Sequence, residues 1–221
     1  EVYYQHLFNA PVDTFSSSFS MLNQGSGFDR YFPGKLTNAG TGRNYGMELT
    51  VEKFFSRNWF VLATASVFDS KYQGSDGRTY NTDFNSSFVA NILGTKEFNW
   101  GKKRKVTLGI GGKLTYAGGK RYSPLDTLAS IAIADEVVLD SARNTLQFPN
   151  YFRADVKLYY RINAAKLTHE IGIDLVNVTG QANLLRLQYV GGTRVFAPVN
   201  QIGFLPIFYY RVNFAVGRKR G

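Results

Sequence analysis

The sequence predicts an all-β chain, and more narrowly a transmembrane antiparallel β-barrel of which about eight strands are present. Three observations predict this fold class: apolar and polar residues alternate with a period of two, several such segments reach about 10 residues, and the segments between them are alternately short and long. No run approaches the ~18 apolar residues that a transmembrane helix needs, so strands would have to make any membrane crossing.

Eight segments carry the strand pattern. In Lys105–Tyr116 apolar side chains occupy alternate positions and face a set of Lys, Thr and Gly residues, and Asn44–Glu52 and Phe208–Phe214 repeat that period. A helix would need apolar spacings of three and four, which these segments lack. The other five predicted strands are Val2–Phe8, Trp59–Tyr72, Asp83–Phe98, Tyr151–Arg161 and Thr168–Val178.

The predicted connections alternate in length along the chain. Short turns are expected at Ser56–Asn58, Asn99–Lys103 and Asn163–Lys166. Outer-membrane barrels have short turns on the periplasmic rim and long loops outside, whereas a soluble sandwich has no reason to sort its connections. The longer segments are Ala10–Gly42, Gly74–Asn81, Gly118–Asn150 and Gly180–Leu205.

Aromatic residues gather near the ends of the predicted strands. Amphipathic rings settle at the membrane–water boundary, which predicts two girdles, although aromatics also favour strands in general. The residues concerned are Tyr3, Tyr4, Tyr45, Phe54, Phe55, Trp59, Phe60, Tyr72, Phe98, Trp100, Tyr116, Tyr151, Phe152, Tyr159 and Tyr160.

The formal net charge of +10 raises nucleic acid or anionic lipid as a partner. The basic residues cluster at the predicted short turns and in the tail rather than along a strand face with stacking aromatics, so no nucleic-acid partner is expected. Attraction to lipid head groups and simple solvation both explain them. These residues are Arg57, Lys102, Lys103, Arg104, Lys105, Lys166, Arg218, Lys219 and Arg220.

No constellation for catalysis is visible. The two histidines, His6 and His169, lie far apart in predicted strand ends, and the chain has no cysteine. No nucleophile–base spacing, phosphate loop or paired metal carboxylates is present. We therefore expect no enzyme, no catalytic or metal-binding residue and no cofactor.

Three motifs resemble the C-terminal barrel region of TonB-dependent outer-membrane receptors of the Bacteroidetes type. They are "N-Y-G-x-E" within 40–48, "G-G-x-R-Y-x-P-x-D" at 118–126 and "D-x-x-N-V-T" followed by an Asn within 174–183, in that order, before a final strand with an aromatic end at Phe214. Two departures are Gly180, where the family pattern has a second Asn, and the seven residues that follow Phe214.

The resemblance implies the last strands of a 22-stranded barrel that holds a plug domain. It implies a barrel segment at 1–217, a basic tail at 218–221, a location in the bacterial outer membrane, and partners in outer-membrane lipid, the upstream plug, the inner-membrane protein TonB and a surface lipoprotein. The function implied is active import of a scarce ligand. From loop position and residue type, the ligand-binding candidates are Arg30, Tyr31, Arg121, Tyr122, Asp126 and Arg186.

A polar strand face must look inward in such a barrel, because a midplane charge on the lipid side costs ~2–4 kcal/mol. This face is predicted to carry Glu48, Glu52, Asn85, Asn91, Glu97, Lys113, Asp155, Lys157, Arg161, Glu170, Asp174, Arg211 and Asn213. Two interpretations apply: an internal salt-bridge network, or contacts with the plug. The lumen- or plug-facing candidates are Glu48, Glu52, Lys113, Asp155, Lys157, Asp174 and Arg211.

Two other functions remain open on the sequence. In the first, the barrel is a fixed structural component of a larger outer-membrane complex. In the second, it is a small stand-alone passive barrel or adhesin, because eight strands suffice to close a barrel. An upstream plug with a TonB box would favour the transporter.

Overall fold

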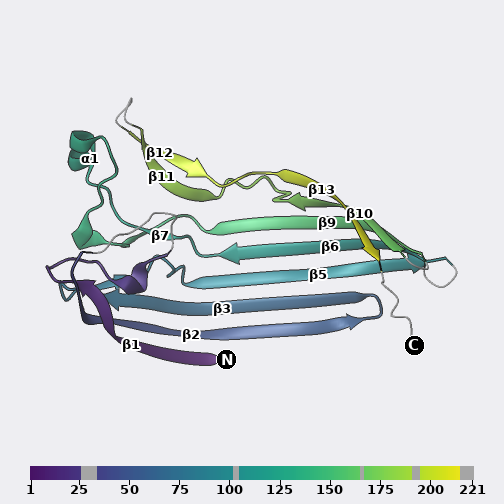
Figure 1. Ribbon diagram of the computed structural model, residues 1–221, viewed down its shortest axis with the longest axis horizontal. Coiled ribbons are helices and arrows are strands. Elements are labelled where there is room, and N and C mark those ends of the chain that lie inside the picture. Colours follow the sequence, from purple (N-terminus) through teal and green to yellow (C-terminus); the bar gives the residue numbers. More distant parts are fainter. Residues whose placement is uncertain (26–33, 102–104, 165–166, 191–194, 215–221) are drawn as a thin grey trace, which may run out of the picture.

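A long, curved antiparallel sheet makes up most of the molecule (Figure 1). The computed structural model describes residues 1–25, 34–101, 105–164, 167–190 and 195–214. Within these ranges the chain is nearly all β, with one short α-helix, α1 (Thr127–Ile133). In the described ranges, no helix has the length and apolar character that a bilayer crossing requires.

All eight predicted strands are confirmed as neighbours in one sheet. In sheet order, which is also chain order, they are β1 (Val2–Asp13), β2 (Leu36–Ser56), β3 (Trp59–Gln73), β5 (Phe88–Trp100), β6 (Val106–Ala117), β9 (Tyr151–Asn163), β10 (Leu167–Val176) and β13 (Leu205–Phe214). Every neighbouring pair is antiparallel, and the three-residue β4 (Thr79–Asn81) adds to the end of β3.

Two predicted segments have different bounds in the structure. The predicted loop Ala10–Gly42 is shorter, because β1 runs to Asp13 and pairs with β2 as far back as Leu36. The pairing shifts register around Asn9, which has a left-handed φ of 56°, and this bulge hid the two-residue period. The predicted strand Asp83–Phe98 begins only at Phe88.

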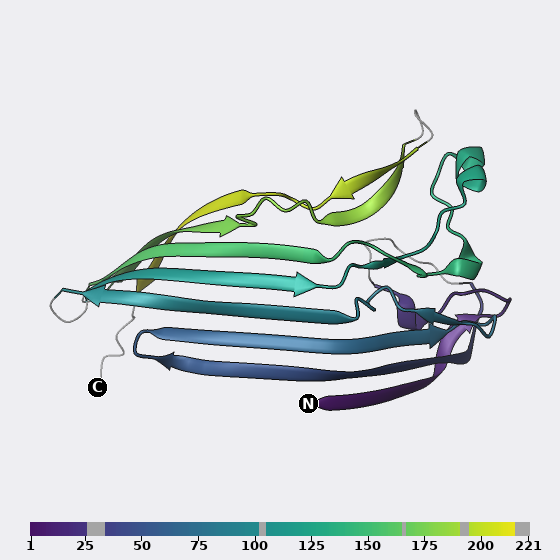
Figure 2. The same ribbon diagram turned by 180° about the vertical axis from the view of Figure 1, so that it is seen from behind.

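The sorting of connections by length is confirmed. The β2–β3 hairpin turns on Arg57 and Asn58, whose positive φ angles of 50° and 64° suit a two-residue turn that matches strand twist. Both ribbon views show this turn at the opposite end of the sheet from the long loops (Figures 1 and 2). We call these the turn end and the loop end.

The loop end contains structure that the sequence did not reveal. The predicted loop Gly118–Asn150 holds β7 (Arg121–Tyr122) paired with β8 (Leu146–Gln147), α1, and the 3₁₀ turn η3 (Asp140–Ala142). The predicted loop Gly180–Leu205 contains a hairpin of β11 (Leu184–Val190) and β12 (Val195–Asn200). A further 3₁₀ turn, η1 (Met21–Asn23), follows β1.

The sheet is open within the described residues. The outer edge of β1 and the outer edge of β13 have no strand partner there. A closed barrel is therefore not observed, and the fold established is an antiparallel sheet of the predicted strand order.

Cross-strand register divides the sheet into two faces of opposite character. Partners across an antiparallel pair share a face, and the pairing of Lys113 with Asp155 and with Leu93 carries one face across three strands. That face holds most of the polar strand residues and is called the polar face. The other, the apolar face, includes Val2, Tyr4, Tyr45, Met47, Leu49, Val51, Val67, Ile92, Ile110, Leu114, Ile171, Phe208, Tyr210 and Phe214.

The apolar face is exposed. Val2 and Phe208, on strands at opposite edges of the sheet, are each 78% accessible, and Leu49 is 63% accessible. Lys96 lies on this face near the turn end, where its ammonium donates to the Arg57 carbonyl at 3.1 Å. The charged tip thus lies at the sheet end and leaves the centre of the face apolar.

The predicted strand-end aromatics divide between the faces. On the apolar face, Trp59, Phe98, Trp100 and Tyr160 lie toward the turn end, and Tyr4, Tyr45, Tyr116 and Phe152 toward the loop end. Tyr3, Phe60, Tyr72, Tyr151 and Tyr159 lie on the polar face instead. Strand-end position does not separate the two groups, because only register parity shows which face a ring takes.

Two glycines on the polar face lie under tyrosine rings. A Cβ built on Gly109 would overlap the ring of Tyr159, and one on Gly172 would overlap Tyr209. Each pair is directly opposite across a strand boundary. The missing side chain lets each ring lie flat across its neighbouring strand.

Gly109→Ala should destabilise the fold by ~1–3 kcal/mol, because the new methyl group displaces the Tyr159 ring. Gly112→Ala is the control. Gly112 is on the same strand but on the apolar face, and its Cβ would meet, among the described residues, only the Asp155 carbonyl oxygen at 3.9 Å. Urea unfolding of the purified protein measures both. Equal midpoints for the two variants would show that the ring does not depend on Gly109.

Candidate functional site

A polar network crosses the sheet on the polar face, with Glu170 of β10 at its centre. Its carboxylate accepts from Arg161 Nε at 2.8 Å and from the Tyr209 hydroxyl at 3.0 Å. Arg211 Nη1 lies 3.8 Å away. Glu170 is only 4% accessible, so its charge depends on these partners rather than on water.

The network continues past β6 to β5. Arg161 Nη1 lies 3.3 Å from Glu97 Oε1, which also accepts from the Tyr159 hydroxyl at 2.6 Å. Glu97, Gly109 and Tyr159 are in register, so Tyr159 reaches Glu97 by crossing over the glycine. The resulting row of Glu97, Arg161, Glu170 and Arg211 alternates in charge and is satisfied within the sheet.

A second group of ion pairs lies nearer the loop end. Lys157 Nζ pairs with Asp174 at 2.9 Å and lies 4.4 Å from the centroid of the Tyr209 ring. Arg153 pairs with Asp155 at 2.7 Å, and the backbone N–H of Asn177 donates to that carboxylate. These side chains surround a shallow hollow of about 320 Å³ on the sheet.

The structure places five of the seven predicted polar-face candidates in these two groups. Asp155, Lys157 and Asp174 line the hollow, with Lys113 directly opposite Asp155. Arg211 belongs to the Glu170 network. The other two, Glu48 and Glu52, share the face but lie on β2, where their side chains are exposed and have no ion pair among the described residues.

Some members of these groups were missed or misplaced. Tyr159, predicted in a girdle, belongs to the Glu170 network instead. The sequence does not predict Tyr209 or Arg153 as members, because an isolated strand pattern shows neither which ring crosses a glycine nor which charges pair between strands. Asn85 was expected on a strand face, but it lies in the loop before β5, is fully buried, and donates to Asp69 and Asn81.

The ligand candidates in the loops are held by contacts within the protein. Arg121 donates to the Asn85 carbonyl at 2.9 Å, and Tyr122 stacks on Phe148 with ring centroids 4.1 Å apart. Asp126 caps α1 by accepting from the Ala129 N–H. These contacts give the three residues a structural role in the packing of the loops.

The remaining loop candidates do not join them. Arg186 lies exposed on β11, with a single 3.4 Å contact to Gln188. Arg30 and Tyr31 lie outside the described residues, as do Lys102, Lys103, Arg104, Lys166 and the tail 218–221. The six ligand candidates are therefore not shown to form one site.

A polar cavity of about 390 Å³ opens among the loops and includes Arg121 and Tyr122. Three basic and two acidic side chains contribute to its lining. Its walls offer both charged and polar groups to a polar ligand at the loop end. Its walls also include Ser18, Tyr72, Lys120, Glu136 and Arg143.

Asp140 holds two residues of the cavity wall, Ser18 and Arg143, in place. Its carboxylate accepts from the Ser18 backbone N–H at 2.9 Å and from the Ser18 hydroxyl, and Arg143 Nη2 lies 3.4 Å away. Partial burial opposes ionisation, but the Ser18 hydrogen bonds and the Arg143 charge outweigh it and lower the pKa of Asp140 below its ordinary value of 3.8.

Two of the family-like motifs anchor loops. A Cβ on Gly118 or Gly119 would overlap the carbonyl of Ser86 or Phe148, so both glycines permit close backbone approach. Asn183 bonds both backbone groups of Phe152, donating to its oxygen at 2.8 Å and accepting from its N–H at 3.0 Å. These motif residues fix loop bases rather than offering free ligand groups.

The described part of the chain holds no candidate metal centre, and the comparisons identify no relative. Among the described residues, no three or more His, Cys, Asp or Glu side chains gather closely enough to hold a metal ion. Comparisons with protein-family models, curated proteins and solved structures found no match for this chain. The resemblance to TonB-dependent receptors therefore stays a prediction that rests on the motifs.

Glu170→Gln should destabilise the protein by about 3 kcal/mol, because it leaves the Arg161 guanidinium without its nearest carboxylate in a buried network. Glu48→Gln removes a carboxylate from the same face, where it is exposed, and should change stability by less than about 0.5 kcal/mol. Urea unfolding midpoints of the two variants test this. If Glu170→Gln were as stable as Glu48→Gln, the network would not hold the strands together.

Acidification should free the segment around Ser18, because it protonates the Asp140 carboxylate that binds Ser18. Because the folded pKa of Asp140 is lowered, its contribution is present above pH 3.8 and is lost as the pH falls through the folded value. At pH 7 Asp140→Asn should mimic that loss and speed chymotrypsin cleavage after Phe15 and Phe19. Asp135→Asn is the control, because among the described residues this carboxylate bonds only the adjacent Glu136 N–H. Equal cleavage rates at pH 7 would contradict this anchoring role.

Proposed function

We propose that the sheet is part of the wall of an outer-membrane β-barrel, with the apolar face toward lipid and the polar face toward the lumen. The observation that carries this proposal is the exposure of a whole apolar sheet face opposite a satisfied ionic network. In water such a face would favour aggregation, whereas in a bilayer it is the favourable arrangement.

The dimensions of the apolar face suit a bilayer. On β5, Phe88 and Phe98 lie near opposite ends of the face. Ten residues of strand span ~33 Å, which at a barrel tilt of about 40° corresponds to ~25 Å of height. That is the height of the apolar band in outer-membrane barrels, and the two aromatic groups would then lie at its boundaries.

The outer edges of β1 and β13 have no strand partner within the described ranges, which favours a wall that further strands complete. Backbone N–H and C=O groups in a bilayer have no water to bond, so an open sheet edge is not viable there. A larger barrel satisfies both edges with additional strands. Closure of these eight strands on one another would satisfy them too, and it is the arrangement that the stand-alone alternative requires.

The proposed activity is energised import of a scarce ligand across the outer membrane. It rests on the motif resemblance to TonB-dependent receptors, which implies an upstream plug in the lumen, coupling to TonB and a surface lipoprotein partner. The polar loop cavity would then face outside and take part in ligand capture. The barrel would act as scaffold and gate with no covalent chemistry, no cofactor and no nucleic acid.

Import can be tested in cells that lack the gene and in cells complemented with it. Radiolabelled ferric siderophore, cobalamin and oligosaccharide are each supplied, with and without a protonophore. Uptake of one probe should fall to background without the gene, and equally in complemented cells whose proton gradient is dissipated.

The other outcomes of the uptake experiment distinguish import from the two alternative functions. Uptake that needs the gene but ignores the protonophore would contradict energised import and favour a passive barrel. Uptake of every probe unchanged by loss of the gene would contradict import of these ligand classes. If partners also stay bound after detergent extraction, that second result would favour a structural component of a larger complex.

A further inference from the structure

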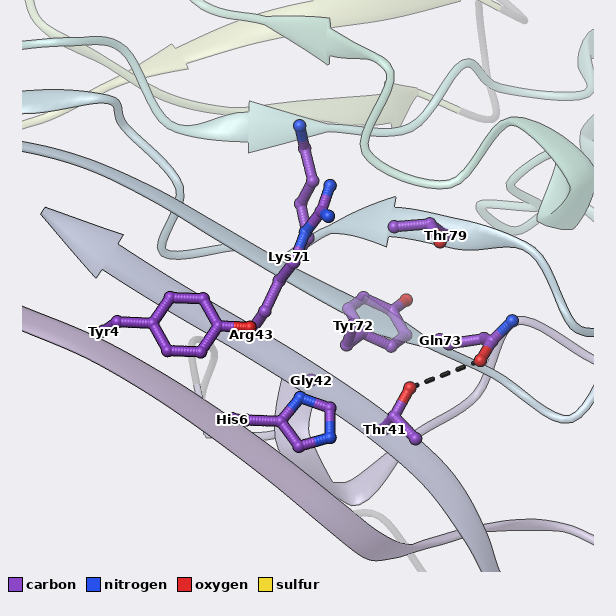
Figure 3. Close-up of a pocket in the computed structure, with 9 residues that line it drawn as sticks. All are labelled: Tyr4, His6, Thr41, Gly42, Arg43, Lys71, Tyr72, Gln73 and Thr79. Atoms are coloured by element: carbon purple, nitrogen blue, oxygen red, sulfur yellow. Dashed lines mark hydrogen bonds between the residues drawn. The ribbon is translucent and has the colours of Figure 1, made fainter.

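A basic pocket lies on the apolar side of the sheet, where the apolar face ends toward the loops. His6, Arg43 and Lys71 are in register on β1, β2 and β3 and line a cavity of about 260 Å³ (Figure 3). Figure 3 shows the Arg43 and Lys71 side chains extending in the same direction from their neighbouring strands. Two long cations therefore extend side by side from β2 and β3, with His6 in register on β1 and lining the same cavity.

The charge of this pocket is only partly used within the protein. Lys71 Nζ lies 3.1 Å from Asp69 Oδ2, and that carboxylate also accepts from Tyr45 and Asn85. The Arg43 side chain is exposed and has no hydrogen-bond or ion-pair partner among the described residues. Its planar guanidinium keeps all its donors for an anion, and Lys71 keeps two of its three.

An apolar groove adjoins the pocket. Its volume is about 780 Å³, and its lining includes Val2, Tyr4, Met47 and Val67. Tyr4 lines both the groove and the basic pocket, so the two are contiguous. An anion site next to an apolar groove is complementary to a phosphorylated lipid, which has a phosphate head and an acyl chain.

We propose that this compound site binds a membrane lipid with a phosphate head group. Arg43 and Lys71 bind the phosphate with His6 beside it, and an acyl chain lies along Val2, Tyr4 and Met47. The proposal rests on the proposed membrane position of the sheet, which places this border at the surface of the leaflet on the loop side. The lipid would hold β1, β2 and β3 together at the edge of the described sheet.

Native mass spectrometry of the full-length protein in detergent tests this site. Dioleoyl phosphatidic acid is the probe, and dioleoylglycerol, dihexanoyl phosphatidic acid and inorganic phosphate separate the contributions of head and chain. The wild type should bind dioleoyl phosphatidic acid most tightly. Arg43→Gln/Lys71→Gln should weaken that binding about 30-fold, because each cation near an anionic lipid contributes to affinity.

A matched variant removes two cations elsewhere. Lys35→Gln/Lys105→Gln changes exposed lysines, one toward each end of the sheet, and should keep dioleoyl phosphatidic acid affinity within about twofold of the wild type. Equal affinity of the wild type and Arg43→Gln/Lys71→Gln would overturn the proposal. So would equally tight binding of dioleoylglycerol or inorganic phosphate, or a protein dimer that occupies the groove.

Flotation of the wild type with phosphatidylcholine liposomes separates the two proposals. Protein that floats but shows no phosphate preference leaves the membrane wall intact and overturns the lipid site alone. Protein that fails to float overturns the membrane position, and the lipid site with it.

Discussion

The two faces of the sheet depend on the register between its eight neighbouring strands, which keeps side chains of the same kind on the same face. Each strand places alternate side chains on opposite faces, and a slip of one residue would move charges onto the apolar face. The pairing of Thr107 with Arg161 and with Asn99 shows how β5, β6 and β9 keep polar residues together. Two faces with opposite solvent requirements follow from that register.

The Glu170 network is the means by which the polar face enforces this register. Glu170 bonds partners on both flanking strands, β9 and β13, and Arg161 extends the row to Glu97 on β5. A shift between any of these strands would leave a buried charge unpaired, which costs far more than an exposed ion pair gains. Gly109 and Gly172 make room for the tyrosines that complete it.

The sequence predicted strand order, turn ends and polar-face residues well, because each follows from local alternation or from turn chemistry. It did not predict the β11–β12 hairpin, because β12 is a continuous apolar run with Pro198 in it and has no two-residue alternation. It also missed Tyr159 and Tyr209 as network members, since crossing a glycine is a relation between strands. The sequence correctly places Arg121, Tyr122 and Asp126 in a long connection between strands. It does not show their contacts to Asn85, Phe148 and Ala129, because these form only in the folded loops.

The two-sided environment of the sheet can be measured directly by nitroxide scanning of β6, because this chain has no native cysteine. Single cysteines at each position from 107 to 116 of the full-length protein in liposomes would be labelled and their collision rates with oxygen measured. Lipid contact predicts high oxygen accessibility at Leu108, Ile110 and Leu114 and low values at Thr107, Lys113 and Thr115. Uniform accessibility, or the opposite alternation, would contradict a lipid-facing apolar surface.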